Sequence, residues 1–329
     1  SGEWLSNEGA VFVAGNYLNS NLVADSGTVT FDTTTGYFSV EGGPHGEGVI
    51  SKHVYETPDG QVHEYGVCSF SFGQLRLTGS TKVILRGDKA LSLSTVGTGE
   101  IYLGSDLRLD GGHASEINGY GGRPVLNPWR GRSSYRQQGF GPGGPPVQGA
   151  WGVGASYTYG DDQLTQLIPG SSGSSGSYLQ GSGAGGGAIE LKAGGDLTIA
   201  PGTIVSANGG NGRINAHQWE HGGGGSGGAI RLVGKNIYNK GLVQAIGGNR
   251  AAGGGRIALA ASESIERGVM AAGSGSIVEI RPPVVSGPDK IYLAYRGEGT
   301  VQVRKNVTTR PMNLVAYWPM DEGFGTTTT

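Results

Sequence analysis

The chain has 329 residues with a formal net charge of −2 at pH 7, and only 15% of its residues are charged. This balance gives no electrostatic reason to expect nucleic acid or an anionic membrane as a partner. Glycine accounts for 66 residues, about three times its ordinary share, which leaves collagen, disorder or a repeat fold.

The distribution of glycine and apolar residues favours the repeat fold. Collagen is excluded because its strict Gly-X-Y period is absent. Disorder is disfavoured because segments such as Lys82–Leu85 and Ala229–Val233 are rich in branched side chains. Cys68 is the single cysteine, which excludes an intrachain disulfide and a thiolate metal cluster. No segment approaches the roughly 18 apolar residues of a membrane helix, so membrane insertion is not expected.

Short segments of alternating apolar and polar residues run through the first third of the chain and predict β-strands. Glycine interrupts every candidate helical period. Val54–Glu56 and Val62–Tyr65 flank the turn signal Thr57-Pro58-Asp59-Gly60, and together they predict a hairpin. The other predicted strands of this part are Ala10–Ala14, Thr28–Asp32, Tyr37–Glu41, Gln74–Thr78, Lys82–Arg86, Leu91–Ser94, Ile101–Gly104 and Leu107–Asp110.

The stretch between Asp110 and Ala188 is the least regular part of the chain. Structureless loops of this length are uncommon in compact domains, so we interpret it as an insertion on one face. Tyr and Trp stack on sugar rings, while Arg pairs with carboxylate or sulfate groups. The candidate ligand-binding residues are therefore Trp129, Arg130, Arg132, Tyr135 and Tyr159. The alternative is that these side chains hold the long loop on the body of the protein.

Two neighbouring carboxylates in the insertion are candidate metal ligands. Asp161 and Asp162 follow Tyr159-Gly160 and could bind calcium through carboxylate and backbone oxygens. The alternative is a polar turn, because Asp commonly accepts hydrogen bonds from backbone amides in turns. Apart from this calcium ion, no cofactor is expected.

The second half of the chain repeats. Ala188–Leu191 is matched by Ala229–Leu232 and again by Arg256–Leu259. Each of these strands is followed by a second short strand and, after a glycine, by a third. The predicted second strands are Leu197–Ile199, Asn236–Tyr238 and Ser264–Glu266, and the third strands are Thr203–Ala207, Leu242–Ile246 and Val269–Ala272. Three strands per unit predict stacked coils that bury their apolar sides against one another.

The sequence therefore predicts an all-β fold, a right-handed parallel β-helix with irregular glycine-rich loop insertions. Glycine has two expected roles in it. Tight corners need positive φ, and small residues let neighbouring backbones approach closely.

Two parts of the chain resemble known families. Leu314–Gly323 (Leu-Val-Ala-Tyr-Trp-Pro-Met-Asp-Glu-Gly) resembles the opening strand of laminin-G-like, or concanavalin-A-like, domains. The body resembles the glycine-rich β-helical segments of large secreted bacterial surface proteins. The residues that carry this second resemblance are Gly183–Leu191, Ser226–Leu232, Gly253–Leu259 and Tyr159–Ser171. The resemblance implies an extracellular location, secreted or at the cell surface, within a multi-domain parent that has carbohydrate-facing neighbours.

These observations divide the chain into four expected regions. An N-terminal β cap spans 1–70, and the glycine-rich β-helix spans 71–285 with its insertion at 111–187. A C-terminal β extension covers 286–313. Residues 314–329 form the first strand of a truncated laminin-G-like domain.

Three groups of residues suggest catalysis, each beside a simpler alternative. Asp106, Arg108 and Asp110 alternate along one strand, as the acidic and basic groups of β-helical polysaccharide lyases would, although such alternation is also typical of a solvated face. Glu56 and Glu64 on the predicted hairpin could supply the two carboxylates of a glycosidase. The string His217–His221 matches the His-x-x-Glu-His pattern of zinc proteases, but flanking glycines leave no room for a long helix.

Two hypotheses from different classes follow. The first is an extracellular structural or adhesive module of a bacterial surface protein, which contacts a polysaccharide or the cell-surface matrix through its insertion and can self-associate. The second is a polysaccharide-degrading enzyme, a lyase or a glycoside hydrolase, on the same scaffold. The sequence favours the module over the enzyme because it contains no recognisable set of catalytic residues.

Overall fold

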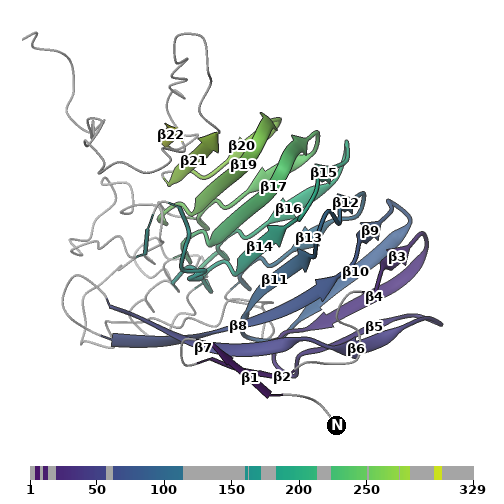
Figure 1. Cartoon of the computed structure of the whole chain (residues 1–329). Coiled ribbons are helices and arrows are strands. Elements are labelled where there is room, and N and C mark those ends of the chain that lie inside the picture. The colour runs from purple at the N-terminus through teal and green to yellow at the C-terminus, as the bar shows by residue number, and fades with distance from the viewer. Residues whose placement is uncertain are drawn as a thin grey trace, which may run out of the picture.

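The protein is built from strands throughout the part of the chain that can be described. The computed structural model describes residues 4–7, 10–13, 20–56, 62–113, 160–161, 163–171, 183–212, 224–249, 252–273, 275–281 and 300–305. Every regular element in these ranges is a strand, which confirms the predicted all-β class. These ranges contain no helix that could span a bilayer. Figure 1 shows the strands following one another in chain order along the molecule.

Parallel strands form three rows, and neighbours within a row are mostly far apart in sequence. The first row contains β8 (Val62–Phe72), β11 (Ala90–Thr95), β14 (Ala188–Lys192), the first halves of β17 (Ala229–Asn239) and β19 (Arg256–Glu266), β21 (Ser276–Arg281) and β22 (Thr300–Lys305). The second row contains β3 (Leu22–Ala24), β9 (Leu75–Leu77), β12 (Ile101–Leu103), β15 (Leu197–Ile199) and the second halves of β17 and β19. The third row contains β13 (Leu107–Arg108), β16 (Ile204–Ser206), β18 (Leu242–Gln244) and β20 (Val269–Ala271).

Each repeat identified in the sequence contributes to all three rows. Ala188–Leu191 pairs in register with Ala229–Leu232, which pairs with Arg256–Leu259, as their matching sequences predict. One difference concerns the first and second strands of the later repeats, which are continuous in β17 and β19. The register shifts between Gly234 and Asn236, so a β-bulge joins two strands that the sequence predicts as separate.

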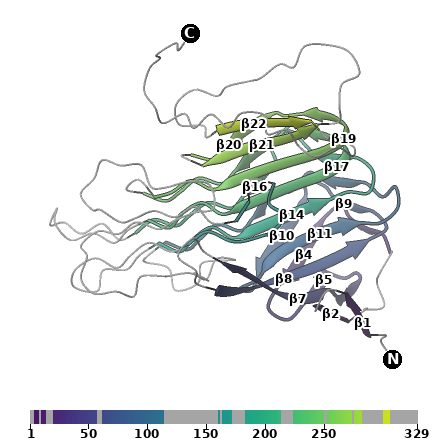
Figure 2. The same cartoon turned by 60° about the vertical axis from the view of Figure 1, so that its left-hand side comes forward.

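The N-terminal part adds antiparallel strands to this arrangement (Figure 2). β4 (Gly27–Asp32) pairs in parallel with β10 (Thr81–Arg86), and β5 (Tyr37–Val40) and β6 (His45–Glu47) continue that sheet in the antiparallel sense. β7 (Val49–Glu56) forms with β8 the predicted hairpin, which is longer than the sequence indicated. β1 (Trp4–Asn7) pairs only with β2 (Ala10–Val13).

The core consists of columns of like side chains that run across the rows. In the first row, Leu93, Leu191, Leu232 and Leu259 occupy successive paired positions, and each is 0% exposed. Stacking of identical positions follows from the in-register pairing, because alternate residues of every strand point to the same side. Each fully buried leucine contributes roughly 1.5–3 kcal/mol. At the N-terminal end of the column, four phenylalanine rings pack against one another: Phe31, Phe38, Phe70 and Phe72.

Glycine-rich segments form a second packed unit, which we call the glycine bundle: residues 109–112, 183–187, 207–212, 224–228, 245–249 and 252–255. Backbone hydrogen bonds of 2.8–2.9 Å join the N–H of Ala184 to the carbonyl of Gly112, and continue through Gly210 and Gly225 to Gly248. A Cβ on Gly225 would collide with the carbonyl of Ala184. Close approach therefore explains the glycines of the bundle, while positive φ occurs at corners such as Gly202.

Candidate functional site

Most residues predicted to bind a ligand fall outside the described ranges. Trp129, Arg130, Arg132, Tyr135 and Tyr159 do so, and so does Asp162. Their assignments stay predictions. The structure does describe Asp161 and the points at which the insertion leaves and rejoins the body.

Four residues that border segments outside the described ranges contact one another, and we call them the root cluster: His113, Asn211, Gly212 and Asn249. The N–H of Asn211 donates to Nδ1 of His113 at 2.8 Å, and the N–H of Asn249 donates to Oδ1 of Asn211 at 2.7 Å. The N–H of Gly212 donates to Oδ1 of Asn249 at 2.8 Å. Hydrogen bonds therefore hold together the residues at positions 113, 212 and 249, each of which precedes a segment outside the described ranges.

Asp161 organises a tight turn through its carboxylate. Oδ1 accepts hydrogen bonds from the N–H groups of Gln163 at 2.8 Å and Thr165 at 3.1 Å. Oδ2 accepts from the hydroxyl of Thr165 and from the N–H of Gln166 at 3.4 Å. This is the arrangement expected for a polar turn. The calcium site predicted for Asp161 together with Asp162 stays a prediction.

The turn positions a segment that we call the strap, residues 163–171. Its side chains Leu164, Leu167 and Ile168 are buried, each at 6% exposure or less. They belong to a second apolar cluster, outside the main core, whose other members are Tyr55, Tyr65, Val67, Ala90, Ala188, Ala229 and Ala258. Two of the alanines, Ala188 and Ala229, occupy paired positions of neighbouring strands. The small size of the alanines leaves room for the strap. The strap thus ties the β7–β8 hairpin to the repeats.

The pKa values around the strap reflect this packing. Burial, with a smaller contribution from the charge of Asp161, raises the pKa of Tyr65 to about 12, so its phenol stays protonated. Partial burial alone would raise the pKa of Asp161. The hydrogen bonds from Thr165, Gln163 and Gln166 outweigh that effect and place the pKa below its ordinary value.

Replacing Asp161 by alanine is expected to loosen the strap by about 1–2 kcal/mol, because hydrogen bonds to an ionised acceptor are lost. Since the folded-state pKa is depressed, the contribution is complete above the unfolded value of about 4 and disappears as the pH falls through the folded pKa. Hydrogen exchange of residues 163–168 should show both effects. Asp25→Ala, at an exposed turn, is the control; equal exchange in both variants would contradict the assignment.

The first set of catalytic candidates is engaged in structural hydrogen bonds. Oδ1 of Asp106 accepts from the N–H of Ile204 at 2.8 Å, and its Oδ2 pairs with the guanidinium of Arg108 at 2.7 Å. Asp110 accepts from the N–H of Asn208 at 2.7 Å and from the hydroxyl of Ser206 at 3.0 Å. Both carboxylates thus tie one strand to the next in the third row.

Of the other catalytic candidates, the structure brings Glu56 and Glu64 near each other. Glu56 and Glu64 lie diagonally on the same exposed face of the β7–β8 hairpin, opposite Val62 and Val54 respectively. The string 217–221 lies outside the described residues. Within the described ranges, no group of three or more His, Cys, Asp or Glu side chains is arranged to hold a metal ion.

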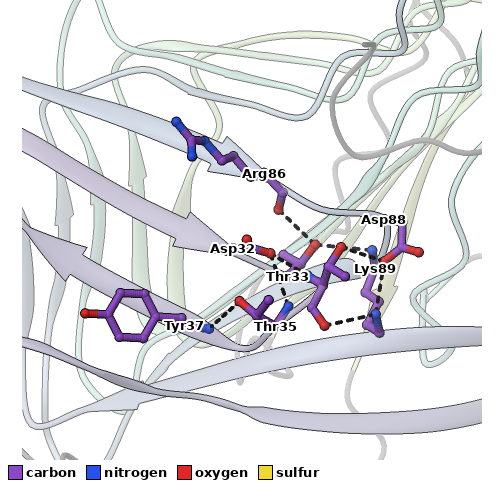
Figure 3. Close-up of polar contacts among 8 residues, drawn as sticks. Asp32, Thr33, Thr35, Tyr37, Arg86, Asp88 and Lys89 are labelled. Atoms are coloured by element: carbon purple, nitrogen blue, oxygen red, sulfur yellow. Dashed lines mark hydrogen bonds and ion pairs between the residues drawn. The ribbon is translucent and has the colours of Figure 1, made fainter. Parts of the chain in front are cut away.

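Sequence reasoning missed a polar cluster that joins two turns (Figure 3). Oδ1 of Asp32 accepts from the N–H of Thr34 at 2.9 Å, and the hydroxyl of Thr34 donates to Asp88 at 2.9 Å. The ammonium of Lys89 donates to Asp88 at 3.0 Å. Partial burial opposes ionisation of Asp88, but these hydrogen bonds lower its pKa. The run of threonines after Asp32 is the sequence signal for such a turn.

A second missed group lies on the outer face of the first row, where three successive strands contribute one polar residue each. Glu190 accepts from the hydroxyl of Ser92 at 2.7 Å and pairs with the guanidinium of Arg231 at 2.8 Å. Because Glu190 is paired with Ser92 and Arg231 in the strand registers, the group is a cross-strand ladder. Its members pair with one another across the strands, which indicates a structural role.

Comparison with known proteins gives no relative from which these sites could be assigned. No family model, no curated protein and no solved structure matches this chain.

Proposed function

We propose that the chain is a right-handed parallel β-helix and serves as an extracellular structural or adhesive module of a large bacterial surface protein. The three in-register rows of parallel strands support the β-helix, because one turn of such a fold contributes one strand to each row. The continuous columns of buried leucine and isoleucine support a structural role, since each repeat is stabilised by its neighbours.

The root cluster is the observation that carries the adhesive part of the proposal. Its hydrogen bonds form one rigid base, and the segments after His113, Gly212 and Asn249 begin at this base. The longest of these segments contains the aromatic and arginine residues suited to sugar rings and their acidic groups. A rigid base reduces the entropy lost when loops bind a ligand, and so favours binding by loops of this composition. The proposed ligand is an acidic polysaccharide.

A panel of neutral and acidic polysaccharides tests the proposal, with and without calcium. Binding to immobilised glycans should occur without new reducing ends and without the ultraviolet absorbance of unsaturated uronates. Unsaturated products would establish a lyase, and reducing ends alone would establish a hydrolase. No binding across the panel would remove the adhesive part of the proposal and leave a structural spacer.

The residues proposed for binding can be tested separately. Trp129→Ala combined with Arg132→Ala should weaken binding to an acidic glycan by about tenfold or more, because stacking and a charge pair are both lost. Tyr238→Ala, on the outer side of the second row, is the matched control and should leave binding unchanged. Equal loss in both variants, or none in either, would contradict the assignment. Thermal unfolding of each variant excludes a folding defect.

A further inference from the structure

The outward side chains of the second row form a ladder of aromatic and polar residues. Tyr102, Thr198 and Tyr238 occupy paired positions of β12, β15 and β17, and all three are partly exposed. Each lies between two residues that are at most 1% exposed, so its side chain points away from the core. The exposed Arg76 pairs with Tyr102, and its guanidinium lies over the phenol ring, 4.4 Å from the ring centroid. We call these four residues the tyrosine ladder.

Only short connections border the tyrosine ladder. Residues 96–100 and 193–196 join first-row strands to second-row strands, and residues 104–106 and 200–203 join the second row to the third. The long segments of the chain instead connect the third row back to the first. Figure 1 shows β9, β12 and β15 one after another along one side of the molecule. The ladder therefore lies on a row of short turns, separate in the chain from the root cluster.

A second column of outward residues supplies hydrogen-bond acceptors beside the ladder. Glu100, Asp196 and Asn236 each lie two residues before a member of the ladder, and so on the same face. The amide of Asn236 donates to Asp196 at 2.8 Å. Glu266, which pairs with the last tyrosine, makes three carboxylates in the two columns against one cation, Arg76. Such a face repels an anionic chain, and its carboxylates accept hydrogen bonds from hydroxyl groups.

The spacing of the two tyrosines matches the repeat of one kind of glycan. Tyr102 and Tyr238 are two strands apart, which corresponds to about 9.6 Å in a sheet. In an extended β-linked glucan, successive sugars are turned over, so alternate sugars present the same face at a similar repeat. The apolar faces of sugars stack on aromatic rings. One chain that crosses the strands thus contacts both tyrosines through alternate sugars, with the intervening sugar at Thr198.

We infer that the outer face of the second row binds extended neutral glycans, with β-linked glucan chains as the ligand. The stacking of Arg76 on Tyr102 restricts both side chains before a ligand arrives, so less entropy is lost on binding. This face is additional to the insertion, for which an acidic glycan is proposed. The inference holds whether or not the insertion binds.

Calorimetric titration of the full chain with cellohexaose, a soluble neutral β-linked chain, tests this inference. The wild type should bind cellohexaose more tightly than maltohexaose, whose α-links curve a chain of the same sugars. Tyr102→Ala and Tyr238→Ala should each weaken cellohexaose binding by about threefold to tenfold, because one stacking contact is lost. Tyr37→Ala, at a 42% exposed tyrosine outside the second row, is the matched control and should bind like the wild type.

The length of the ligand tests the spacing itself. Cellobiose has two sugars and reaches one tyrosine, whereas cellotetraose reaches both. The gain in affinity from cellobiose to cellotetraose should therefore be smaller in Tyr238→Ala than in the wild type. Tyr102→Phe combined with Tyr238→Phe keeps both rings and should retain binding, and thermal unfolding of each variant excludes a folding defect.

Three results would overturn the inference: a wild type that does not bind cellohexaose, equal binding of maltohexaose, or a length dependence that Tyr238→Ala leaves unchanged. An equal loss in Tyr37→Ala would do the same. The Trp129→Ala and Arg132→Ala variant should bind cellohexaose like the wild type, because these residues are proposed to bind acidic glycans. Failure of one glycan site is thus distinguished from failure of the other.

Discussion

Gly228→Ala should lower the free energy of unfolding by more than about 3 kcal/mol, through overpacking and loss of backbone hydrogen bonds. Gly228 lies in the glycine bundle, where its N–H donates to the carbonyl of Ala207 at 2.8 Å. A Cβ at this position would collide with the carbonyl of Gly187. The clash is between two backbones that are bonded to further segments on both sides, so neither can move without breaking other hydrogen bonds.

Gly202→Ala separates this steric effect from the loss of backbone freedom. Gly202 has a φ of 79°, and a Cβ there would have no atom within 4 Å. Alanine at this corner should therefore cost only the left-handed backbone penalty of about 1–2 kcal/mol. Chemical denaturation followed by circular dichroism measures both variants. Equal losses would mean that the backbones of the bundle shift to accommodate the added methyl group, and would contradict the steric role of Gly228.

The repeats could be predicted from the sequence because their physical cause is local. Alternation of side chains in Ala188–Leu191 and its two copies predicts strands with one buried face, and matching sequences predict matching register. The columns of leucine follow from the same rule. The predicted strands differ from those observed mainly where a bulge joins two of them, at Gly234.

The strap could not be predicted because its burial depends on distant residues. Leu164, Leu167 and Ile168 have neither a strand period nor a helix period, and they are buried in a cluster with alanines from four strands, β11, β14, β17 and β19. Leu164 even adopts a φ of 52°, which propensity alone would disfavour. The Asp161 turn, in contrast, has a local signal, because Asp followed by polar residues commonly accepts hydrogen bonds from backbone amides.

One position in the leucine column breaks the rule of apolar stacking. Glu279 pairs with Leu259 in the strand register, and it is 2% exposed at a position where earlier strands place leucine. Its carboxylate lies 3.5 Å from the Nε of Arg267, whose side chain is 26% exposed. Nearby, Asn239 takes the place of a core isoleucine in the second row and donates to the carbonyl of Arg267 at 2.7 Å. Glu279 and Asn239 thus place two polar side chains in the core, and both contact Arg267.

Glu279→Ala should lower the free energy of unfolding by roughly 3 kcal/mol, because removal of one partner leaves a charge without compensation in a mostly buried place. The value lies at the lower end of the usual range because Arg267 keeps part of its side chain in water. The double variant Glu279→Leu with Arg267→Met should recover this loss or exceed the wild type, since well-packed apolar residues often replace a buried ion pair without cost. Urea denaturation of the three proteins checks the order. A double variant that is less stable than Glu279→Ala would show that the ion pair itself holds the last repeats together.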